Sequence, residues 1–194
     1  MADDDSAAKR APGSLELVRA LVNTRELFDD DGREVDTDDI STPDELAGWL
    51  AAHDLPGAGE ALGQGDVDRM AELREALRAV LLANHGAELD PQAAAALDQA
   101  TSAAPVVLRF DPDGGAGLRP ACAGIDGAIA VIATAIHEAM REGTWERLKV
   151  CPASDCKWAF YDRSRNHSRT WCSMESCGNR AKVRAFRERQ SGAA

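Results

Sequence analysis

Four cysteines near the carboxyl end of the chain have the spacing of a metal site. Cys151 and Cys156 are separated by four residues, fifteen residues follow, and Cys172 and Cys177 repeat the spacing of four. Zn²⁺ takes four donors at the corners of a tetrahedron, and two closely spaced pairs of thiolates supply them. Because four protein ligands leave no open coordination position, the pattern predicts one structural zinc ion. His167, which lies between the pairs, is the alternative ligand.

The segment that carries these cysteines has few large apolar side chains for its length. A module of this size buries too little apolar surface to fold by itself. Structural zinc contributes roughly 10–16 kcal/mol in small modules of this kind. We therefore expect the metal to decide whether residues 145–191 fold.

The charge of the chain is divided unevenly between this segment and the rest. The 194 residues have a net charge of −11. Residues 145–194 hold 11 Lys and Arg and 5 Asp and Glu, a charge of +6, whereas residues 1–144 hold 11 and 28, a charge of −17. Four thiolates and a zinc ion lower the first value to about +4. A basic module indicates a polyanion as partner, unless the two parts of the chain simply attract each other.

Several basic and amide side chains of this module are candidates for contact with nucleic acid. Arg180, Arg184 and Arg187 share one face of a helix predicted over residues 179–189. Such a helix could enter a major groove, and arginines between the cysteine pairs could hold phosphates. We predict binding of nucleic acid, preferentially DNA, through Arg163, Arg165, Asn166, Arg169, Arg180, Lys182, Arg184 and Arg187.

Other side chains of the module have both a functional and a structural interpretation. Asn179 could contact a base, or it could cap the helix or bind a nearby carbonyl group. Trp158 and Trp171 could stack on unpaired bases, which would favour RNA or single strands, or they could pack in the module's core. Val183 and Phe186 are expected to point inward. The alternative function is a protein-interaction finger without direct contact to nucleic acid.

The first 144 residues predict a mainly helical domain. Apolar residues recur at helical spacing after Ser14, a candidate N-cap, and again over residues 66–84. The acidic segment 29–39 predicts a loop or a short hairpin. Further helices are expected at 43–53, 91–103 and 124–140, and a short β-hairpin at 105–110 and 117–123. The predicted domains are a disordered tail (1–12), a helical domain (13–144) and a small treble-clef or ribbon-like zinc finger (145–191).

Nothing in the sequence predicts an enzyme or a membrane protein. His53, His85 and His137 are scattered and lack an accompanying nucleophile, and we expect His137 to lie in the core. Cys122 is expected to be a small buried apolar residue. The longest apolar stretch, 128–136, is too short to span a bilayer, and the acidic start does not look like a secretory signal. We therefore expect a cytoplasmic protein.

Short strings in both parts of the chain resemble known families. The finger contains C-G-N-R at residues 177–180, R-x-W-C-S-M at 169–174 and F-x-D-x-S-x-N at 160–166, and it resembles the CGNR zinc-finger family. The strings L-V-N-T-R at 21–25 and L-R-E-A-L-R at 73–78 resemble the ABATE domain. The resemblance implies a bacterial transcription regulator linked to stress, with zinc bound by the cysteines. The helical domain could then sense a small-molecule effector or a protein partner, and a homodimer would suit a two-fold DNA site.

Overall fold

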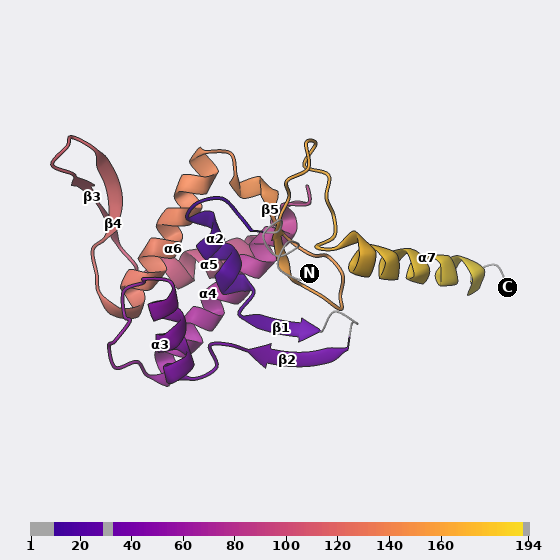
Figure 1. Ribbon diagram of the computed structural model, residues 1–194, viewed down its shortest axis with the longest axis horizontal. Coiled ribbons are helices and arrows are strands. Elements are labelled where there is room, and N and C mark those ends of the chain that lie inside the picture. The colour runs from indigo at the N-terminus through magenta and orange to yellow at the C-terminus, as the bar shows by residue number, and fades with distance from the viewer. Residues whose placement is uncertain (1–9, 29–32, 192–194) are drawn as a thin grey trace.

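The computed structural model describes residues 10–28 and 33–191 (Figure 1). The expected disorder of residues 1–9 lies outside this range. Residues 10–12, the remainder of the predicted tail, are described. Ala11 is buried, and its N–H donates to Glu16 Oε2 at 2.7 Å.

The body consists of helices with two projecting hairpins, and a third hairpin begins the finger (Figure 1). Each described sheet has two antiparallel strands. The elements, in chain order, are α2 (Leu15–Val22), β1 (Arg25–Phe28), β2 (Glu34–Asp38), α3 (Pro43–Ala52), α4 (Gln64–Ala83), α5 (Pro91–Thr101), β3 (Val106–Phe110), β4 (Ala116–Pro120), α6 (Gly124–Arg141), the 3-10 turn η1 (Trp145–Arg147), β5 (Leu148–Val150), β6 (Ala159–Tyr161), the π-helical turn η2 (Met174–Gly178) and α7 (Asn179–Ser191). This arrangement confirms the predicted fold class.

Local sequence signals explain the starts of α3 and α5, since Asp90 caps α5 and a proline opens each helix. Thr42 and Glu45 form a reciprocal capping box before α3, in which Glu45 N donates to Thr42 Oγ1 at 3.3 Å and Thr42 N donates to Glu45 Oε2 at 3.0 Å. Ser14 is the N-cap residue of α2, as predicted, but it does not cap the helix with its side chain. Its hydroxyl makes no capping bond and donates instead to Glu138 Oε2 at 3.3 Å. A partner on α6 therefore replaces the local bond.

One hydrophobic core joins the helical body to the hairpin of the finger. Helices α2, α4 and α6 supply most of its side chains, and Leu148, Val150, Ala159 and Tyr161 of β5 and β6 belong to the same cluster. Strand β5 packs on α4, and β6 packs on α2. Asn23 secures this contact, because Ala159 N donates to its Oδ1 at 2.7 Å and its Nδ2 donates to Ala159 O at 2.9 Å.

Two expectations about single residues of the body are wrong or only partly met. His137 is exposed on α6 rather than buried in the core. Cys122 packs against the core but is only partly buried. His53 does lie at a helix end, where its Nδ1 is 2.8 Å from Trp49 O. No helix within residues 10–28 and 33–191 is long and apolar enough to cross a membrane.

Candidate metal centre and the basic surface around it

The four predicted ligands come together in one cluster. All four Sγ atoms lie within 4.8 Å of one another. The separation is 3.4 Å between Cys156 and Cys172, and 3.6 Å between Cys172 and Cys177. Tetrahedral zinc with Zn–S bonds of about 2.3 Å requires sulfurs about 3.8 Å apart. The cluster thus has the donor chemistry and the size of a tetrahedral thiolate site, and His167 lies outside it.

The proximity of the thiols perturbs their ionisation. Hydrogen bonds with Cys156 and Cys172 lower the pKa of Cys151 to about 2. The hydrogen bond with Cys151 raises the pKa of Cys156 to about 12, and contacts with both of these residues raise the pKa of Cys172. The thiolate of Cys151 therefore disfavours ionisation of Cys156 and Cys172. A divalent cation would remove this conflict, because it attracts all four thiolates.

Each pair of ligands is held by a tight turn. The first pair lies between β5 and β6, where Cys151 N donates to Trp158 O at 2.9 Å and Cys156 N donates to Ala153 O at 3.2 Å. The next residue, Lys157, has a φ of 62°, a conformation that favours glycine. The second pair ends in η2, so Cys177 lies directly before α7. Hairpin, turn and helix match the predicted finger arrangement.

The aromatic side chains divide between the metal centre and the body core. Phe160 is fully buried beside the cysteines, with Trp158 and Trp171 packed against the same cluster. Ala159 and Tyr161 point the other way, into the body core. Successive residues of a strand face opposite sides, so β6 connects the two clusters. Both tryptophans pack against the cysteine cluster while staying partly buried, which favours the core interpretation, and Tyr161 packs in the body core instead.

The C-G-N-R string has a structural role that its individual contacts explain. A Cβ on Gly178 would lie 2.5 Å from Met174 Sδ and 3.2 Å from Trp171 Cδ1, so only glycine fits without movement. Asn179 Nδ2 donates to Glu175 O at 2.9 Å, which holds the π-helical turn. This bond supports the structural interpretation of Asn179.

The fourth residue of the string, Arg180, faces the metal centre. Its Nη2 donates to Cys177 Sγ at 3.2 Å, and its Nε lies 3.3 Å from Asp155 Oδ2. Arg184 also reaches Asp155 Oδ2, at 3.2 Å, although it is more exposed. A guanidinium beside a thiolate compensates part of the negative charge of a four-thiolate site. Two of the predicted nucleic-acid contacts therefore connect α7 to the first cysteine turn.

Arg169 is also directed inward. Its Nε donates to Trp171 O at 2.9 Å, its Nη2 donates to Cys172 O, and its guanidinium lies over the Phe160 ring at 5.3 Å from the centroid. These contacts fix the backbone that leads into the second pair of ligands.

The loop 162–170 is organised around a buried carboxylate. Asp162 is fully buried and accepts hydrogen bonds from Lys149 Nζ, Ser164 N and Arg169 N, all at 2.9 Å. Lys149 Nζ also donates to His167 O at 2.6 Å. The F-x-D-x-S-x-N string thus fixes the loop that presents the remaining arginines.

Five of the predicted contacts stay accessible on the finger surface. Arg165, Asn166, Lys182 and Arg187 are exposed and make no ion pair or side-chain hydrogen bond with the described part of the chain. Arg163 is exposed as well, but it donates to Arg10 O at 2.9 Å and lies over Tyr161. The expected inward orientation of Val183 and Phe186 is wrong, since they are 49% and 54% exposed.

A second polar network, which the sequence pattern did not identify, brings the two ABATE-like strings together. Arg74 is almost fully buried and binds both carboxylate oxygens of Asp38 at 2.7 Å, as well as Thr24 Oγ1 at 3.0 Å. Arg78 donates to Val22 O at 2.7 Å. The sequence did contain a signal for this network, because Arg74 and Arg78 lie four residues apart on the apolar face of α4. The network fixes the β1–β2 hairpin on the body.

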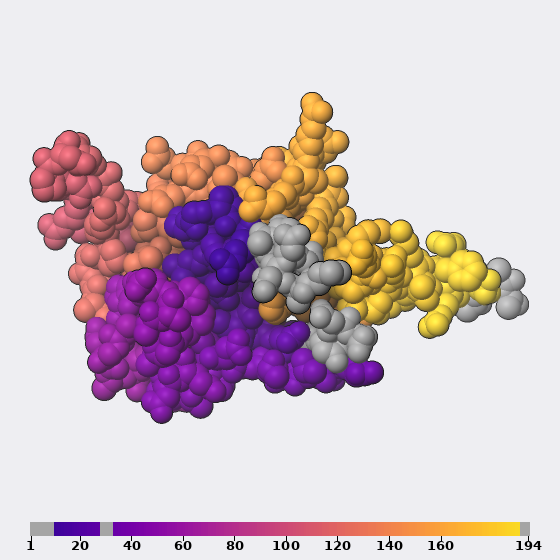
Figure 2. Space-filling model, in the orientation of Figure 1, coloured from indigo at the N-terminus to yellow at the C-terminus, as the bar shows by residue number. Residues whose placement is uncertain are grey.

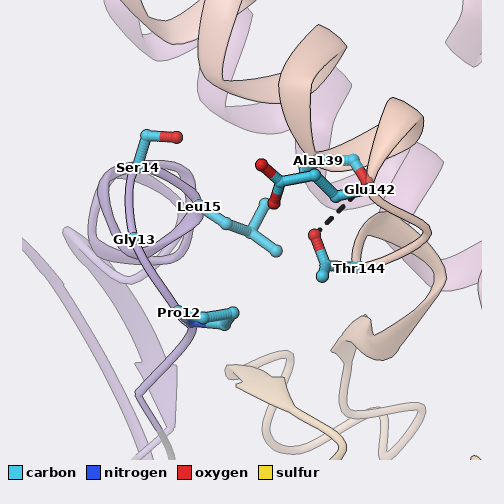
Figure 3. A pocket seen from close by; sticks show the side chains of 7 residues that line it. All are labelled: Pro12, Gly13, Ser14, Leu15, Ala139, Glu142 and Thr144. Atoms are coloured by element: carbon cyan, nitrogen blue, oxygen red, sulfur yellow. Dashed lines mark hydrogen bonds between the residues drawn. The ribbon is translucent and has the colours of Figure 1, made fainter.

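Two hollows that described residues of the body line differ in size. One, of ≈ 100 Å³, lies between the start of α2 and the end of α6, where Thr144 Oγ1 donates to Ala139 O at 3.2 Å (Figure 3). The other is a groove of ≈ 420 Å³ between α4 and α5, lined by five alanines with Glu72, Glu75 and Gln99. Of these two, the groove has the volume of a typical small-molecule site.

The fold and the cysteine cluster define a helical domain followed by a treble-clef-like finger with a candidate metal site. Residues 147–190 match the CGNR zinc finger, and residues 15–143 match ABATE, described as "Putative stress-induced transcription regulator". The second match covers more than half of the chain, so the protein belongs to the ABATE family. Both expected resemblances are confirmed, and neither family is described as an enzyme. No curated protein gives a significant match.

Proposed function

We propose that this protein is a transcription regulator whose finger is held together by one structural zinc ion and binds duplex DNA. The observation that carries the proposal is the position of α7. The helix leaves the metal centre and projects away from the body (Figures 1 and 2). A projecting helix has the steric access that entry into a major groove requires.

The charge of the accessible surface supports the same partner. Helix α7 carries five Lys and Arg and one Glu, a formal charge of +4. Arg180 and Arg184 fix its first turns, so Lys182 and Arg187 are left to reach a ligand. The loop 162–170 adds a second exposed basic segment. The proposed contacts, mainly to phosphates, are Arg163, Arg165, Asn166, Lys182 and Arg187.

The small tertiary contact of α7 also favours a binding role. Its 13 residues pack mainly against η2, and almost every side chain after Ala181 is exposed or half-exposed. Helices shorter than about 12–15 residues are only marginally stable by themselves in water. A DNA groove would cover this helix and stabilise it.

The test is binding of the metal-loaded full chain to duplex DNA, single-stranded DNA and RNA over a salt series. The Lys182→Ala/Arg187→Ala variant removes two exposed cations that hold no structural contact. For each phosphate that the variant no longer neutralises, the slope of log K against log salt should become shallower by about 0.9. The matched control, Arg109→Ala/Arg141→Ala, removes two exposed cations from the body and should bind as the wild type does.

Three results would reject the proposal: no affinity for duplex DNA at low salt with the metal content verified, unchanged binding by the α7 variant, or an equal decrease in the control. A protein-interaction finger would then be the better alternative. Its contact would centre on Val183 and Phe186, which form an exposed apolar pair on α7.

Zinc itself is tested by metal analysis and thiol titration. We expect one zinc ion per chain, and four more thiols reactive after chelation than before it. Two ions per chain, or no protection of the thiols by metal, would contradict a single closed four-thiolate site.

For an effector of the helical domain, the α4–α5 groove is the proposed site. Thermal-shift screening of the full chain should find ligands whose stabilisation disappears in Ala79→Trp, which fills the groove. Ligands unaffected by this substitution would place the effector elsewhere.

A further inference from the structure

The β3–β4 hairpin has one face made entirely of apolar residues. In its register, Val106 is paired with Pro120, Leu108 with Leu118, and Phe110 with Ala116. Directly paired residues of an antiparallel ladder lie on the same face, as do residues two apart along a strand. Val106, Leu108 and Phe110 are 38%, 56% and 76% exposed.

Strand β3 also has an open edge. Strand β4 lies against α6, and β3 is the outer strand (Figure 1). The hydrogen bonds Ala121 N to Pro105 O and Asp111 N to Gly115 O show which residues of β3 point toward β4. In an antiparallel ladder these positions alternate, so the N–H and C=O groups of Val106, Leu108 and Phe110 point outward.

The two edges of the hairpin differ in their protection. On β4, Pro120 has no N–H and blunts the edge. The outward positions of β3 contain neither proline nor a charged residue. Two-stranded sheets are marginally stable in water, and added strands stabilise them. The structure therefore leaves one strand edge able to accept another strand.

We propose that β3 pairs antiparallel with β3 of a second copy of this chain, about a two-fold axis at Leu108. In this register Leu108 lies opposite Leu108 of the second copy, and Val106 lies opposite Phe110. The outward groups of the three residues in each copy then bond reciprocally, and the product is a four-stranded sheet in the order β4, β3, β3, β4. This proposal is independent of the proposed function.

Charge favours a second copy as the occupant of this edge. Residues 104–123 contain two Arg and two Asp and are neutral, whereas residues 1–144 as a whole carry −17. The hairpin projects from the body, so two acidic bodies can stay apart while their hairpins meet (Figure 2). In the proposed register Arg109 lies opposite Val107, so no like charges face each other.

The size of the contact predicts a weak dimer. Phe110 exposes about 150 Å² if its full surface is about 200 Å². Its neighbours add less, so the contact stays well below the roughly 800 Å² per partner of a standard interface. The dimer should therefore dissociate on dilution. Its two fingers would lie at opposite ends, because the hairpin and α7 project from opposite ends of the molecule (Figure 1).

The experiment is sedimentation velocity of the metal-loaded full chain over a wide concentration range. The wild type should shift from monomer to dimer. Leu108→Lys and Leu108→Glu place like charges opposite each other, and each should raise the dimer dissociation constant roughly tenfold or more. An equimolar mixture of the two should recover a heterodimer, because Lys then faces Glu. Leu89→Lys changes an exposed leucine elsewhere and should dimerise as the wild type does.

A second pair of variants tests the register. Val106→Lys/Phe110→Glu forms two cross-strand ion pairs and should retain the dimer, whereas Val106→Lys/Phe110→Lys should not. A wild type that stays monomeric at the highest concentration would overturn the proposal and leave the edge to a strand of a different protein. A Leu108→Lys variant that dimerises normally, or a Lys and Glu mixture that does not associate, would overturn it as well.

Discussion

Replacing Asp162 with asparagine should destabilise the finger more than any exposed acidic substitution. The carboxylate is fully buried and accepts three hydrogen bonds, one of them from the buried ammonium group of Lys149. An amide of the same shape removes the negative charge and leaves that ammonium group without its counter-ion. Its NH₂ group must also face an N–H donor of the loop.

The magnitude follows from the environment of the carboxylate. Burial alone would raise the pKa of Asp162, but the hydrogen bonds from Ser164, Lys149 and Arg169 outweigh it and lower the pKa from 3.8 to about 2. That lowering corresponds to about 2 kcal/mol. Removal of one partner from a buried ion pair costs about 3–5 kcal/mol in other proteins. We expect Asp162→Asn to lower the unfolding free energy by about 2–4 kcal/mol.

The assay is thermal and urea unfolding of the zinc-loaded protein at neutral pH. A destabilisation of this size lowers the Tm of a chain of this length by roughly 5–15 °C. Lys149→Met/Asp162→Asn removes both charges and should recover part of the stability. Asp98→Asn, an exposed control, should change stability by less than about 0.5 kcal/mol.

The pH dependence has a definite sign. A lowered folded-state pKa stabilises the fold above pH 3.8, and this contribution disappears as the pH falls toward 2. The difference between wild type and Asp162→Asn should therefore be complete at neutral pH and shrink in acid. The reasoning is refuted if Asp162→Asn is as stable as Asp98→Asn, or if the double variant is no more stable than Asp162→Asn alone.

Three further predictions concern the cysteine turns. Gly178→Ala should lower the unfolding free energy in urea by about 1 kcal/mol, the low end of the cost of overpacking, because its methyl group meets the half-exposed Met174 side chain. Adding Met174→Ala should restore part of this loss, and no recovery would point to the contact with Trp171 instead. Arg180→Ala removes the hydrogen-bond donor to Cys177 Sγ. It should weaken the retention of zinc in competition with a chelator by about 10–100-fold, and unchanged retention would contradict the role of this hydrogen bond. Lys157→Gly should stabilise the zinc-loaded finger by about 1 kcal/mol, because glycine adopts the left-handed backbone conformation of this position without strain. Thermal unfolding tests this prediction, and a Tm below that of the wild type would disprove it.

Most secondary structure could be predicted because its signals are local. The capping box at Thr42 and Glu45 and the proline at the start of α5 act within one helical turn. Ser14 shows the limit of such signals. It does occupy the N-cap position, but its hydroxyl donates to Glu138 on α6, 124 residues away, in place of the expected local capping bond.

The basic residues of α7 show the same limit at the candidate site. Helical periodicity correctly places Arg180, Arg184 and Arg187 on neighbouring turns. It cannot show that Asp155, which belongs to the first cysteine turn, lies beside two of them. Of the three, only Arg187 is exposed and has no hydrogen bond or ion pair with the described residues. A mutation chosen from the periodicity alone would therefore combine a proposed binding residue with two residues that contact the first cysteine turn of the candidate metal site.

Residue types and short spacings were sufficient to predict the cysteine cluster, the uneven charge and the family. Each depends on residue type and short spacing, and the donor chemistry of four thiolates is the same in any fold. Tertiary structure decided which arginines face solvent and how the finger joins the body. Asn23 bonds to Ala159, 136 residues away, and strands β5 and β6 complete the core of the helical domain. These outcomes depend on contacts between distant segments, which residue spacing along one segment does not encode.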